Sequence, residues 1–595
     1  MRTGRRALTM LAAFAFAVSV SVAPGSVPPT ALAAGETVAI QASAPVVEYG
    51  GSVTITGMVS AEPGCVVSRS VLLEWKAADG DTWVDAGTTT SEPDGSFRFG
   101  STEPATGRYR ATLPEMPPCA ALSSDPVLVR VRARVDVALV AGSLAAGTCG
   151  VSLTATVSPD KAGQRVEVER RRPDGWTTID VLTLDDASRA TTRLCARWQD
   201  IGIVHLRVRW PAQDRLNDAA TSMAVAYRIH EARWMKRIDA LAGRTTSVAL
   251  GEDGAYLYGH ADTQPRTPAS NEKLALSTAL LDRFGRDHRI ITHAAVAGTR
   301  RGVVPGDLWI LGRGDPEVSR ARIAALARRI VDAGVTRVRG RIMGSTSYFR
   351  HDWWATGWRK GISRDYVALP TALTFRGNVI DGAHVRDAER RAAAALTHDL
   401  EALGVEVTGA PGAGAAPSGL TDLATVRSRP LGDILTTMNR WSSNFDAEVL
   451  GKLLGATVSG TPGTIAKGAA AIGSWAASHG VDWTAYDCSG LSYANRTTAR
   501  GVVRLLWAAD AAPWGRALRF SLPAGGQGTL HDRLRDVTLR AKTGTLEDVS
   551  ALSGWVWLER EDAWAEFSML SSGLDKPKAV SVEDRIVRLI ASRAR

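Results

Sequence analysis

The sequence predicts a multidomain protein in which two all-β modules precede an α/β domain. Three observations lead to this prediction. The 595 residues exceed what one hydrophobic core usually holds. Between residues 35 and 228, apolar and polar residues alternate as in half-buried strands, and one pattern recurs 95 residues later. From residue 229 onward, helix-spaced Ala, Arg and Leu residues are interleaved with short apolar strands, which is typical of an α/β domain.

The first 33 residues have the pattern of a secretory signal peptide. Arg2, Arg5 and Arg6 precede an apolar run from Leu8 to Val22, and Ala31-Leu32-Ala33 offers a small-residue cleavage site. An uncleaved anchor is the alternative. No later apolar run approaches the roughly 20 residues of a membrane span. We therefore expect an exported protein that acts in the cell wall or periplasmic space.

Two successive β modules are expected at residues 34–130 and 131–228. Short strands joined by Asp-Gly turns, repeated at this length, resemble immunoglobulin-like sandwiches. A spacer or wall-contacting role is the expectation for this region. The repeat consists of Val71-Leu-Leu-Glu74 with Asp79-Gly80 and Trp83, and of Val166-Glu-Val-Glu169 with Asp174-Gly175 and Trp176.

Cysteine usage agrees with export. Cys65, Cys119, Cys149 and Cys195 lie in the β modules, where proximity favours Cys65–Cys119 and Cys149–Cys195 disulfides in an oxidising compartment. Four cysteines allow three connectivities, so other pairings stay open. Cys488 is expected to be a small buried residue rather than a nucleophile.

In the α/β region, Arg320–Gly334 and Asp387–Leu403 have the spacing of helices, and Leu308–Leu311 has the composition of a strand. The Gly-, Ala- and Pro-rich stretch from Gly409 to Gly419 predicts a loop or boundary. The net charge is +10, but nothing in the chain resembles a nucleic-acid-binding module.

Ser270 and Lys273 are the first candidate catalytic pair. They lie three residues apart at the start of a predicted helix that begins near Pro268, so their side chains share a face. Free backbone N–H groups in a first helical turn favour a developing oxyanion. Only ten of the 71 basic residues are lysine. Lysine is therefore expected where an amine must lose its proton, which arginine cannot do.

A Ser-x-x-Lys spacing is weak evidence by itself. Ser158-Pro159-Asp160-Lys161 has the same spacing. Its Pro and Asp predict a turn between strands with a solvated Lys161, so this copy is interpreted as a decoy.

Two later motifs support the Ser270 interpretation. Ser442-Ser-Asn444 precedes a predicted helix, and Lys542-Thr543-Gly544-Thr545 follows a predicted strand. Ser-x-x-Lys, Ser-x-Asn and Lys-Thr-Gly, in this order, form the motif set of penicillin-binding proteins and class A β-lactamases.

With these motifs the sequence resembles the low-molecular-mass class C penicillin-binding proteins, which are D-alanyl-D-alanine carboxypeptidases/endopeptidases. The resemblance implies an α/β penicilloyl-serine transferase (β-lactamase-like) fold, with a D,D-peptidase domain at 229–295 and 420–595 and a large inserted α/β region at 296–419. Cys488 departs from the family pattern, which has Gly there. The likeness also rests on Arg266-Thr-Pro-Ala-Ser-Asn-Glu-Lys273, Gly314-Asp-Pro316, Asn439-Arg-Trp-Ser-Ser-Asn-Phe-Asp-Ala-Glu448, Asp487-Cys-Ser-Gly-Leu-Ser492 and Leu522-Pro-Ala-Gly-Gly-Gln-Gly-Thr-Leu530.

The resemblance implies four catalytic residues. Ser270 attacks the carbonyl of a D-Ala amide and forms an acyl-enzyme, while neutral Lys273 takes the serine proton. Ser442 relays a proton to the leaving amine, and Asn444 orients Lys273 and the substrate amide.

It also implies a substrate-binding strand. Lys542 and Thr543 hold the terminal carboxylate, and the strand that continues through Gly544 pairs with the extended peptide. The backbone N–H groups of Ser270 and Thr545 form the oxyanion hole.

The implied partners are peptidoglycan stem peptides, with β-lactams as covalent inhibitors, and neither a cofactor nor a metal is expected. Two other functions remain open. One is a catalytically silent cell-wall-binding or scaffolding protein. The other is a β-lactamase or esterase on the same fold.

Overall fold

The computed structural model describes residues 35–102 and 104–592, so the predicted signal peptide lies outside the described residues. The chain forms two compact units. One takes in the described residues up to Leu139 with Leu153–Thr192 and His205–Val225, and the other takes in Val140–Ser152, Arg193–Val204 and the residues from Ala226 onward. Among the residues described, none of the helices combines the length and the apolar character needed to cross a membrane.

The first β module consists of two sheets that share one core. Inward-facing residues such as Ile55, Leu73 and Phe97 alternate with exposed ones, as strands with one buried face require. A short 3₁₀ turn, η1 (Pro63–Cys65), follows β3. The smaller sheet has the order β1 (Thr37–Ala42), β3 (Val53–Ser60), β6 (Ser96–Ser101). The larger has the order β2 (Val46–Glu48), β9 (Val127–Arg132), β7 (Gly107–Leu113), β4 (Ser70–Ala77), β5 (Val84–Thr90), with β8 (Leu122–Ser123) beside β7.

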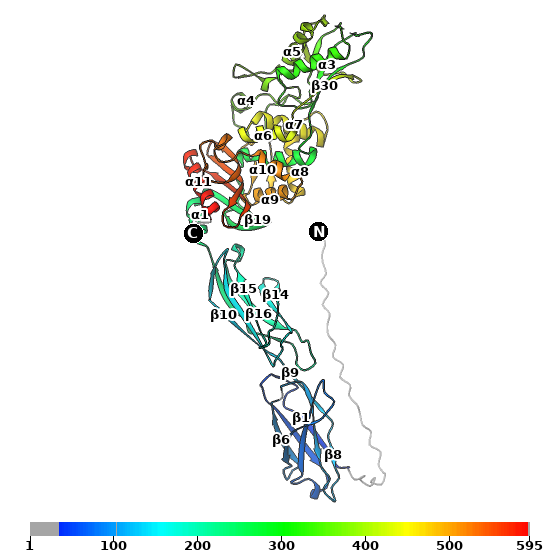
Figure 1. Cartoon of the computed structure of the whole chain (residues 1–595), viewed down its shortest axis with the longest axis vertical. Helices are drawn as coiled ribbons and strands as arrows, with labels where there is room; N and C mark the ends of the chain where they lie inside the picture. Colours follow the sequence, from blue (N-terminus) through cyan, green and yellow to red (C-terminus); the bar gives the residue numbers. More distant parts are fainter. Residues whose placement is uncertain (1–34, 103, 593–595) are drawn as a thin grey trace, which may run out of the picture. The chain divides into compact units, whose positions relative to one another are not determined.

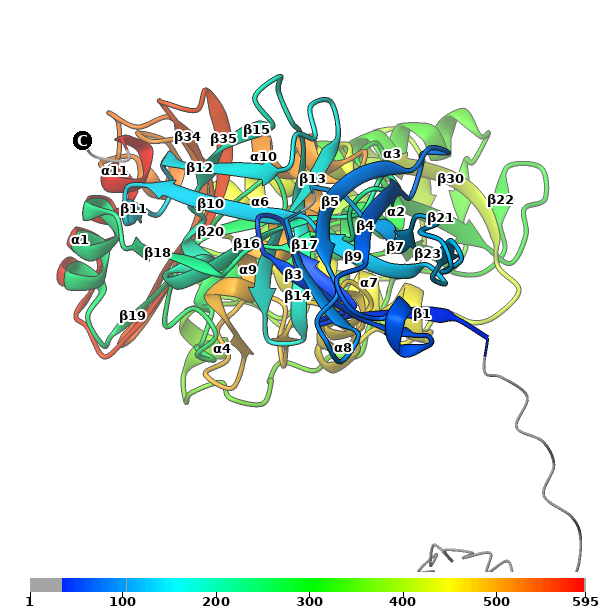
Figure 2. The ribbon, with the colours of Figure 1, turned by 90° about the horizontal axis from the view of Figure 1, so that it is seen from below.

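The second β module repeats this strand order (Figures 1 and 2). β4 begins at Ser70 and β13 at Arg165, so the offset of 95 residues holds in the structure, and a β-bulge recurs after Leu73 and after Val168. The repeat is thus confirmed at the level of topology. The smaller sheet is β10 (Arg134–Val140), β12 (Cys149–Ser158), β15 (Arg189–Cys195). The larger has the order β11 (Ser143–Ala145), β18 (Val225–His230), β16 (Gly202–Trp210), β13 (Arg165–Arg172), β14 (Gly175–Thr183), with β17 (Ala220–Thr221) beside β16. The 3₁₀ turn η2 (Trp198–Asp200) directly precedes β16 in the chain.

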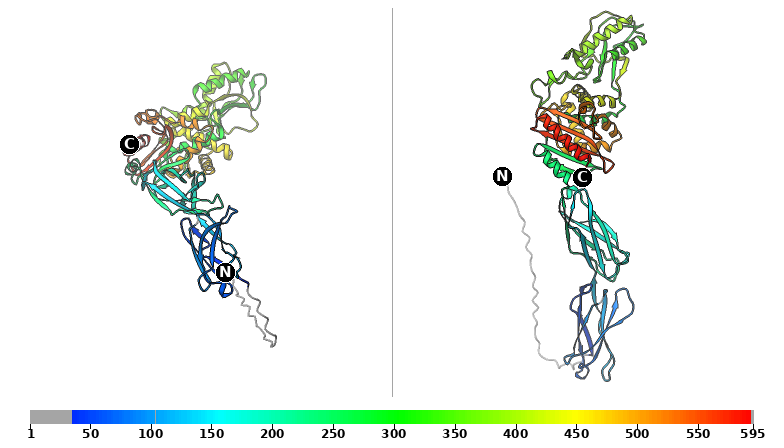
Figure 3. Two further views of the ribbon diagram at one scale, coloured as in Figure 1. Left: turned by 60° about the horizontal axis from the view of Figure 1, so that its bottom comes forward. Right: turned by 60° about the vertical axis from the view of Figure 1, so that its left-hand side comes forward.

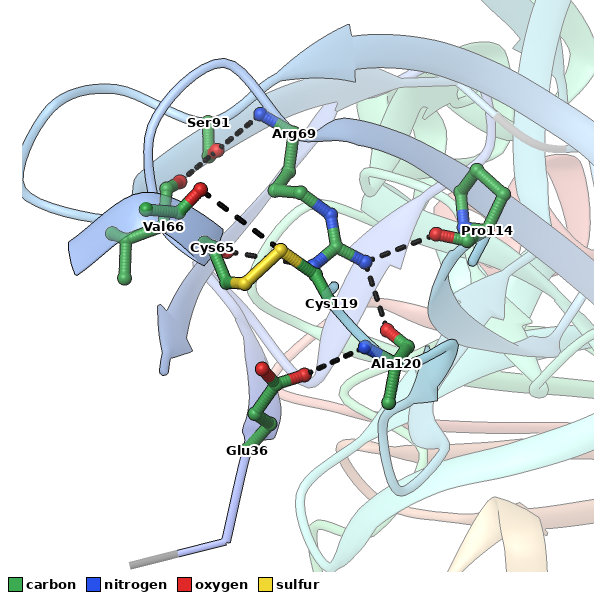
Figure 4. The surroundings of a disulfide bond; sticks show 9 residues. Glu36, Cys65, Val66, Arg69, Ser91, Pro114, Cys119 and Ala120 are labelled. Atoms are coloured by element: carbon green, nitrogen blue, oxygen red, sulfur yellow. Dashed lines mark hydrogen bonds between the residues drawn. A yellow bond between two sulfur atoms is a disulfide. The ribbon is translucent and has the colours of Figure 1, made fainter. Parts of the chain in front are cut away.

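Both predicted disulfides are present, Cys65–Cys119 and Cys149–Cys195, while Cys488 is free and buried. Figure 4 shows the first disulfide beside the buried Arg69. The Arg69 guanidinium donates hydrogen bonds to the carbonyl oxygens of Pro114 (3.0 Å) and Ala120 (2.9 Å), so the loop that carries Cys119 is held at two further points.

The predicted solvation of Lys161 is wrong. This side chain is buried, and its Nζ lies 2.7 Å from Asp214 Oδ2 and 2.8 Å from Asn217 Oδ1. A buried ammonium is tolerated because these two oxygens replace water. Lys161 is therefore a structural ion-pair partner. The interpretation of Ser158-x-x-Lys161 as a decoy does not depend on whether Lys161 is solvated.

An antiparallel five-stranded sheet supports the C-terminal domain. Helix α11 (Lys576–Ser592) packs on β34 and contacts α1 (Arg233–Ala242) (Figures 2 and 3). Helix α9 (Ala499–Asp510) packs on β35 and β19. β33 lies at one edge of the sheet. The strand order is β20 (Ala255–His260), β19 (Thr246–Glu252), β35 (Ala563–Ser572), β34 (Val549–Leu558), β33 (Leu539–Leu546).

A helical layer with its own apolar core lies beside this sheet. Its central helix is α2 (Glu272–Phe284), which follows the predicted nucleophile and whose residues 272–281 are all buried. The surrounding elements are η3 (Ala269–Asn271), α6 (Leu431–Trp441), α7 (Asn444–Ser459), α8 (Ile465–Ser478), α10 (Gly515–Ser521), η5 (Gly528–Leu530) and the short pair β31 (Trp483–Thr484) with β32 (Arg496–Thr497).

The inserted region has a separate core under α3 (Arg320–Asp332) and α5 (Ala388–Ala402) (Figure 1). Its sheet has the order β29 (Gly412–Gly414), β25 (Ile342–Ser345), β23 (Leu308–Leu311), β21 (Ile291–Val296), β30 (Thr421–Arg427). The sheet therefore extends past the predicted limits of 296 and 419, and the stretch predicted as a loop contains β29. The smaller elements are β22 (Val303–Val304), β24 (Arg337–Val338), β28 (Glu406–Val407), α4 (Ile362–Asp365), η4 (Arg376–Asn378), β26 (Val379–Ile380) and β27 (Ala383–His384).

Candidate active site

Ser270 lies in the 3₁₀ turn that leads into α2, close to where the sequence predicts a helix start. Ala269 has a positive φ of 48°, a backbone conformation that non-glycine residues rarely adopt. Gly490 packs against this turn so closely that a Cβ there would lie 1.9 Å from the Ala269 carbonyl oxygen. The glycine thus lets the loop at residues 487–492 support the turn that carries Ser270.

Lys273 is fully buried behind Ser270. Its Nζ lies 3.0 Å from Ser270 Oγ, 2.9 Å from Asn444 Oδ1 and 2.5 Å from the Ser489 carbonyl oxygen. Burial lowers the pKa of Lys273 to about 8, although the nearby carboxylates, Asp487 first among them, oppose that shift. A lysine with this pKa is a practical proton acceptor for the serine hydroxyl.

Ser442 and Asn444 come from the junction of two helices. Ser442 ends α6 in the left-handed conformation, with φ 58°, and the Ser443 side chain caps α7 by accepting from the Asp446 N–H. Asn444 opens α7, and its Nδ2 donates to the Tyr366 carbonyl oxygen at 3.2 Å. The sharp turn between the helices therefore points both motif side chains at the two lysines.

Lys542 is fully buried in β33. Its Nζ donates to Ser442 Oγ at 2.8 Å and to the Thr543 carbonyl oxygen at 2.8 Å. Burial, together with the positive charges of Lys273 and Lys576, holds the pKa of Lys542 well below its usual range. The three sequence motifs thus form one cluster, in which Ser270, Lys273 and Asn444 join on one side and Ser442 and Lys542 on the other.

The remaining motif residues lie along β33, whose outer side faces no other strand in the described part of the chain. Thr543 Oγ1 donates to Thr529 Oγ1 at 2.8 Å. A Cβ on Gly544 would lie 2.9 Å from the Pro268 carbonyl oxygen, so glycine allows the strand to approach the serine turn. Thr545 follows on the exposed side.

A cavity of about 760 Å³ opens onto this cluster. Ser270, Ser442, Asn444, Thr543 and Thr545 all line it. Sequence reasoning missed the rest of the lining. It comes from the inserted region, the segment at 491–493, η5 with Arg533, the end of β33 with the residue after it, and α11. Two of the missed residues, Lys360 and Lys576, are among the ten lysines of the chain. The scarcity of lysine was therefore a signal that could have pointed to them. The additional lining residues are Arg359, Lys360, Ile362, Asp365, Tyr366, Leu491, Tyr493, Thr529, Arg533, Leu546, Glu547, Lys576 and Val580.

Asp487 organises the loop behind Lys273. Its carboxylate accepts from Trp358 Nε1 at 2.8 Å, Asn495 Nδ2 at 2.7 Å and the Ser492 N–H at 2.9 Å. Trp358 belongs to the inserted region, so Asp487 ties that region to the loop whose Ser489 carbonyl oxygen holds Lys273.

Two further carboxyl groups are buried near Lys273. Glu448 Oε1 accepts from the N–H groups of Cys488 (3.1 Å) and Ser489 (2.8 Å), and Glu272 accepts from Trp483 Nε1 (2.9 Å). Burial raises the pKa of Glu448 to about 8 and that of Glu272 well above its usual range. Both residues lie in segments that carry the family resemblance, 266–273 and 439–448, but the sequence predicts no role for them, because their burial depends on the packing of α2, α7 and the loop.

A serine hydroxyl beside a buried, low-pKa lysine, with an open strand edge next to it, defines a serine hydrolase that works by acyl transfer. The D-Ala-D-Ala carboxypeptidase 3 (S13) family model matches residues 236–384 and 382–593, more than half of the chain. The chain belongs to this family. The predicted class, a serine-type D-Ala-D-Ala carboxypeptidase among the low-molecular-mass class C penicillin-binding proteins, is thereby confirmed.

Individual relatives agree with this assignment. The chain is 30% identical over 448 residues to a D-alanyl-D-alanine carboxypeptidase of an Actinomadura species, covering 60% of this chain and 82% of that protein. It is 30% identical over 369 residues to a carboxypeptidase of Mycobacterium tuberculosis, covering 56% and 76%. Penicillin-binding protein 4 of Haemophilus influenzae has the same fold, with a TM-score of 0.53 and 18% identity over 60% of this chain and 99% of that one.

Proposed function

We propose that this enzyme hydrolyses the D-Ala-terminal amide of peptidoglycan stem peptides, or of their cross-links, through an acyl-enzyme on Ser270. The contact between Lys273 Nζ and Ser270 Oγ carries the proposal. Neutral Lys273 removes the hydroxyl proton as Ser270 Oγ bonds to the peptide carbonyl carbon. The backbone N–H groups of Ser270 and Thr545 stabilise the resulting oxyanion, and each such donor contributes about 3–4 kcal/mol in comparable sites.

Breakdown of the tetrahedral intermediate needs a proton on the leaving amine. Ser442 is suited to deliver it because its hydroxyl accepts from Lys542 Nζ and lines the same cavity as Ser270. Asn444 holds the Lys273 amine and offers its side-chain amide to the substrate. Water then hydrolyses the ester, which restores the Ser270 hydroxyl and releases the shortened peptide.

The open edge of β33 is suited to bind the substrate as an added strand. Residues from Lys542 through Gly544 to Thr545 then run alongside the peptide. The charge of Lys542 attracts its carboxylate, and the Thr543 hydroxyl turns from Thr529 to donate to it. A β-lactam presents the same amide and carboxylate, so we expect it to acylate Ser270. We also propose extracytoplasmic action, with residues 34–130 and 131–228 serving as immunoglobulin-like spacer or wall-contacting modules.

Fluorescent penicillin labelling tests the proposal, with Ser158→Ala as the matched control because Ser158 has the same Ser-x-x-Lys spacing. We expect wild type and Ser158→Ala to form one stable adduct and Ser270→Ala to form none while keeping the wild-type melting temperature. Equal labelling of Ser270→Ala would contradict the assignment. A wild type that takes up no label would indicate a catalytically silent wall-binding protein. A wild type that releases the label rapidly would indicate a β-lactamase.

A further inference from the structure

The lysine of the Lys-Thr-Gly motif does not line the cavity. Lys542 is fully buried, and two of its three ammonium protons are donated to Ser442 Oγ and the Thr543 carbonyl oxygen. Its charge acts on the cavity only from behind Ser442 and Thr543, which do line it. A carboxylate bound in the cavity therefore makes its direct ionic contact with another residue.

Four cationic side chains line the cavity, and their partners differ. Arg359 forms an ion pair with Glu547, which also lines the cavity. Arg533 is held by Glu583 and Asp584, each at 2.7 Å, so its charge is already balanced. The other two are lysines: Lys360, exposed in the inserted region, and Lys576, the first residue of α11.

Lys576 is anchored to the substrate-binding strand itself. Its Nζ donates to Ser550 Oγ at 2.7 Å and to the Gly544 carbonyl oxygen at 3.1 Å. Gly544 lies between Thr543 and Thr545, both of which line the cavity. The third ammonium proton of Lys576 has no acceptor among the described residues, and the side chain is half-buried. These contacts hold a partly desolvated cation beside two threonines of the proposed substrate site.

The face of α11 that carries Lys576 also supplies Val580, four residues later, to the cavity lining. Asp575 caps the helix by accepting from the Lys578 N–H at 2.9 Å, which fixes the first turn and with it the origin of the Lys576 side chain. The lysine is therefore positioned by the helix start, by Ser550 and by β33. Lys360 lacks comparable anchoring among the described contacts.

We propose that Lys576 is a specificity-determining residue that binds the free α-carboxylate of the leaving D-amino acid beside Thr543. The inference rests on the proposed function and deepens it. Lys576 makes the direct ionic contact, while Lys542 remains behind Ser442. Peptides whose leaving residue ends in a carboxylate are then the preferred substrate class, and peptides whose carboxylate is masked as an amide are poor substrates.

The test compares two peptides that differ only at the C-terminus, acyl-D-Ala-D-Ala and its C-terminal amide. We expect Lys576→Gln to lower kcat/KM for the acid by about 10- to 100-fold, as the loss of a hydrogen bond to a charged group predicts. The value for the amide should stay within about twofold, since that peptide offers no carboxylate. Lys576→Arg should recover most of the preference for the acid, because it restores the charge.

Lys578→Gln is the matched control. Lys578 is an exposed lysine two residues along the same helix that pairs with Asp575, so its loss should leave both peptides unaffected. Lys576→Met, which keeps the aliphatic stem, provides a second uncharged variant if Lys576→Gln melts at a lower temperature. If Lys576→Gln or Lys576→Met folds and keeps the wild-type ratio of kcat/KM for the acid to kcat/KM for the amide, the inference is overturned. It is also overturned if only Lys360→Gln loses that ratio. A wild type that cleaves neither peptide would instead overturn the proposed function.

Discussion

The pKa of Lys273 predicts the pH dependence of the enzyme. Burial lowers this pKa from 10.5 to about 8. At pH 7 a lysine of pKa 8 is neutral about one time in 11, whereas one of pKa 10.5 is neutral about one time in 3,000. The difference corresponds to about 3 kcal/mol in the free energy needed to hold the amine neutral. Since only the neutral amine accepts the serine proton, the acylation rate should rise with pH and level off above about pH 8.

The assay is kcat/KM for acyl-D-Ala-D-Ala from pH 5.5 to 9.5, with protein melting followed over the same range. We expect the rate to rise about tenfold per pH unit below 7 and to reach half its maximum near pH 8. Lys273→Arg should lose at least about a thousandfold in acylation, because a guanidinium stays protonated. A flat profile between pH 6 and 8, or a Lys273→Arg variant that acylates at the wild-type rate, would show that Lys273 is not the base.

Two further results follow from the structure. Glu448→Gln keeps a side-chain oxygen for the N–H groups of Cys488 and Ser489 but removes a carboxyl group that, in its ionised form near pH 8, raises the pKa of Lys273. It should therefore move the midpoint of the kcat/KM profile to lower pH, and an upward shift would contradict the electrostatic reasoning. All residues that line the active-site cavity lie at or after Ser270, so a chain without residues 35–228 should keep its kcat/KM for a small peptide within about twofold. A folded but inactive truncated chain would show that the β modules help to build the site.

Local patterns in the sequence predict much of this protein. A Ser and a Lys three residues apart at a helix start share a face whatever surrounds them, and the structure places their side chains 3.0 Å apart. The period-2 pattern and the offset of 95 residues likewise predict two similar β modules, because strand periodicity is a local property. Proximity in sequence also sufficed for both disulfides.

The sequence was a poorer guide to burial. Lys161 in a polar turn was expected to be solvated, yet Asp214 and Asn217, more than 50 residues away, bury it. Strand β21 ends at the first residue of the predicted inserted region and β30 begins two residues after its last, yet the two strands pair in its sheet. In each case the deciding partner is distant in sequence, and the choice of a distant partner depends on the packing of whole elements.

The amino-acid sequence by itself determined the enzyme family, the three motifs and the order in which they occur, because these depend on residue identity and short spacing. Only the tertiary structure decided how the motifs meet: Lys273 reaches Asn444 across 171 residues, and Lys542 reaches Ser442 across 100. It alone revealed that Lys542 is sealed behind the cavity while Lys576 lines it. The physical reason is that burial, and with it the charge state of a lysine, is set by every element packed around the side chain.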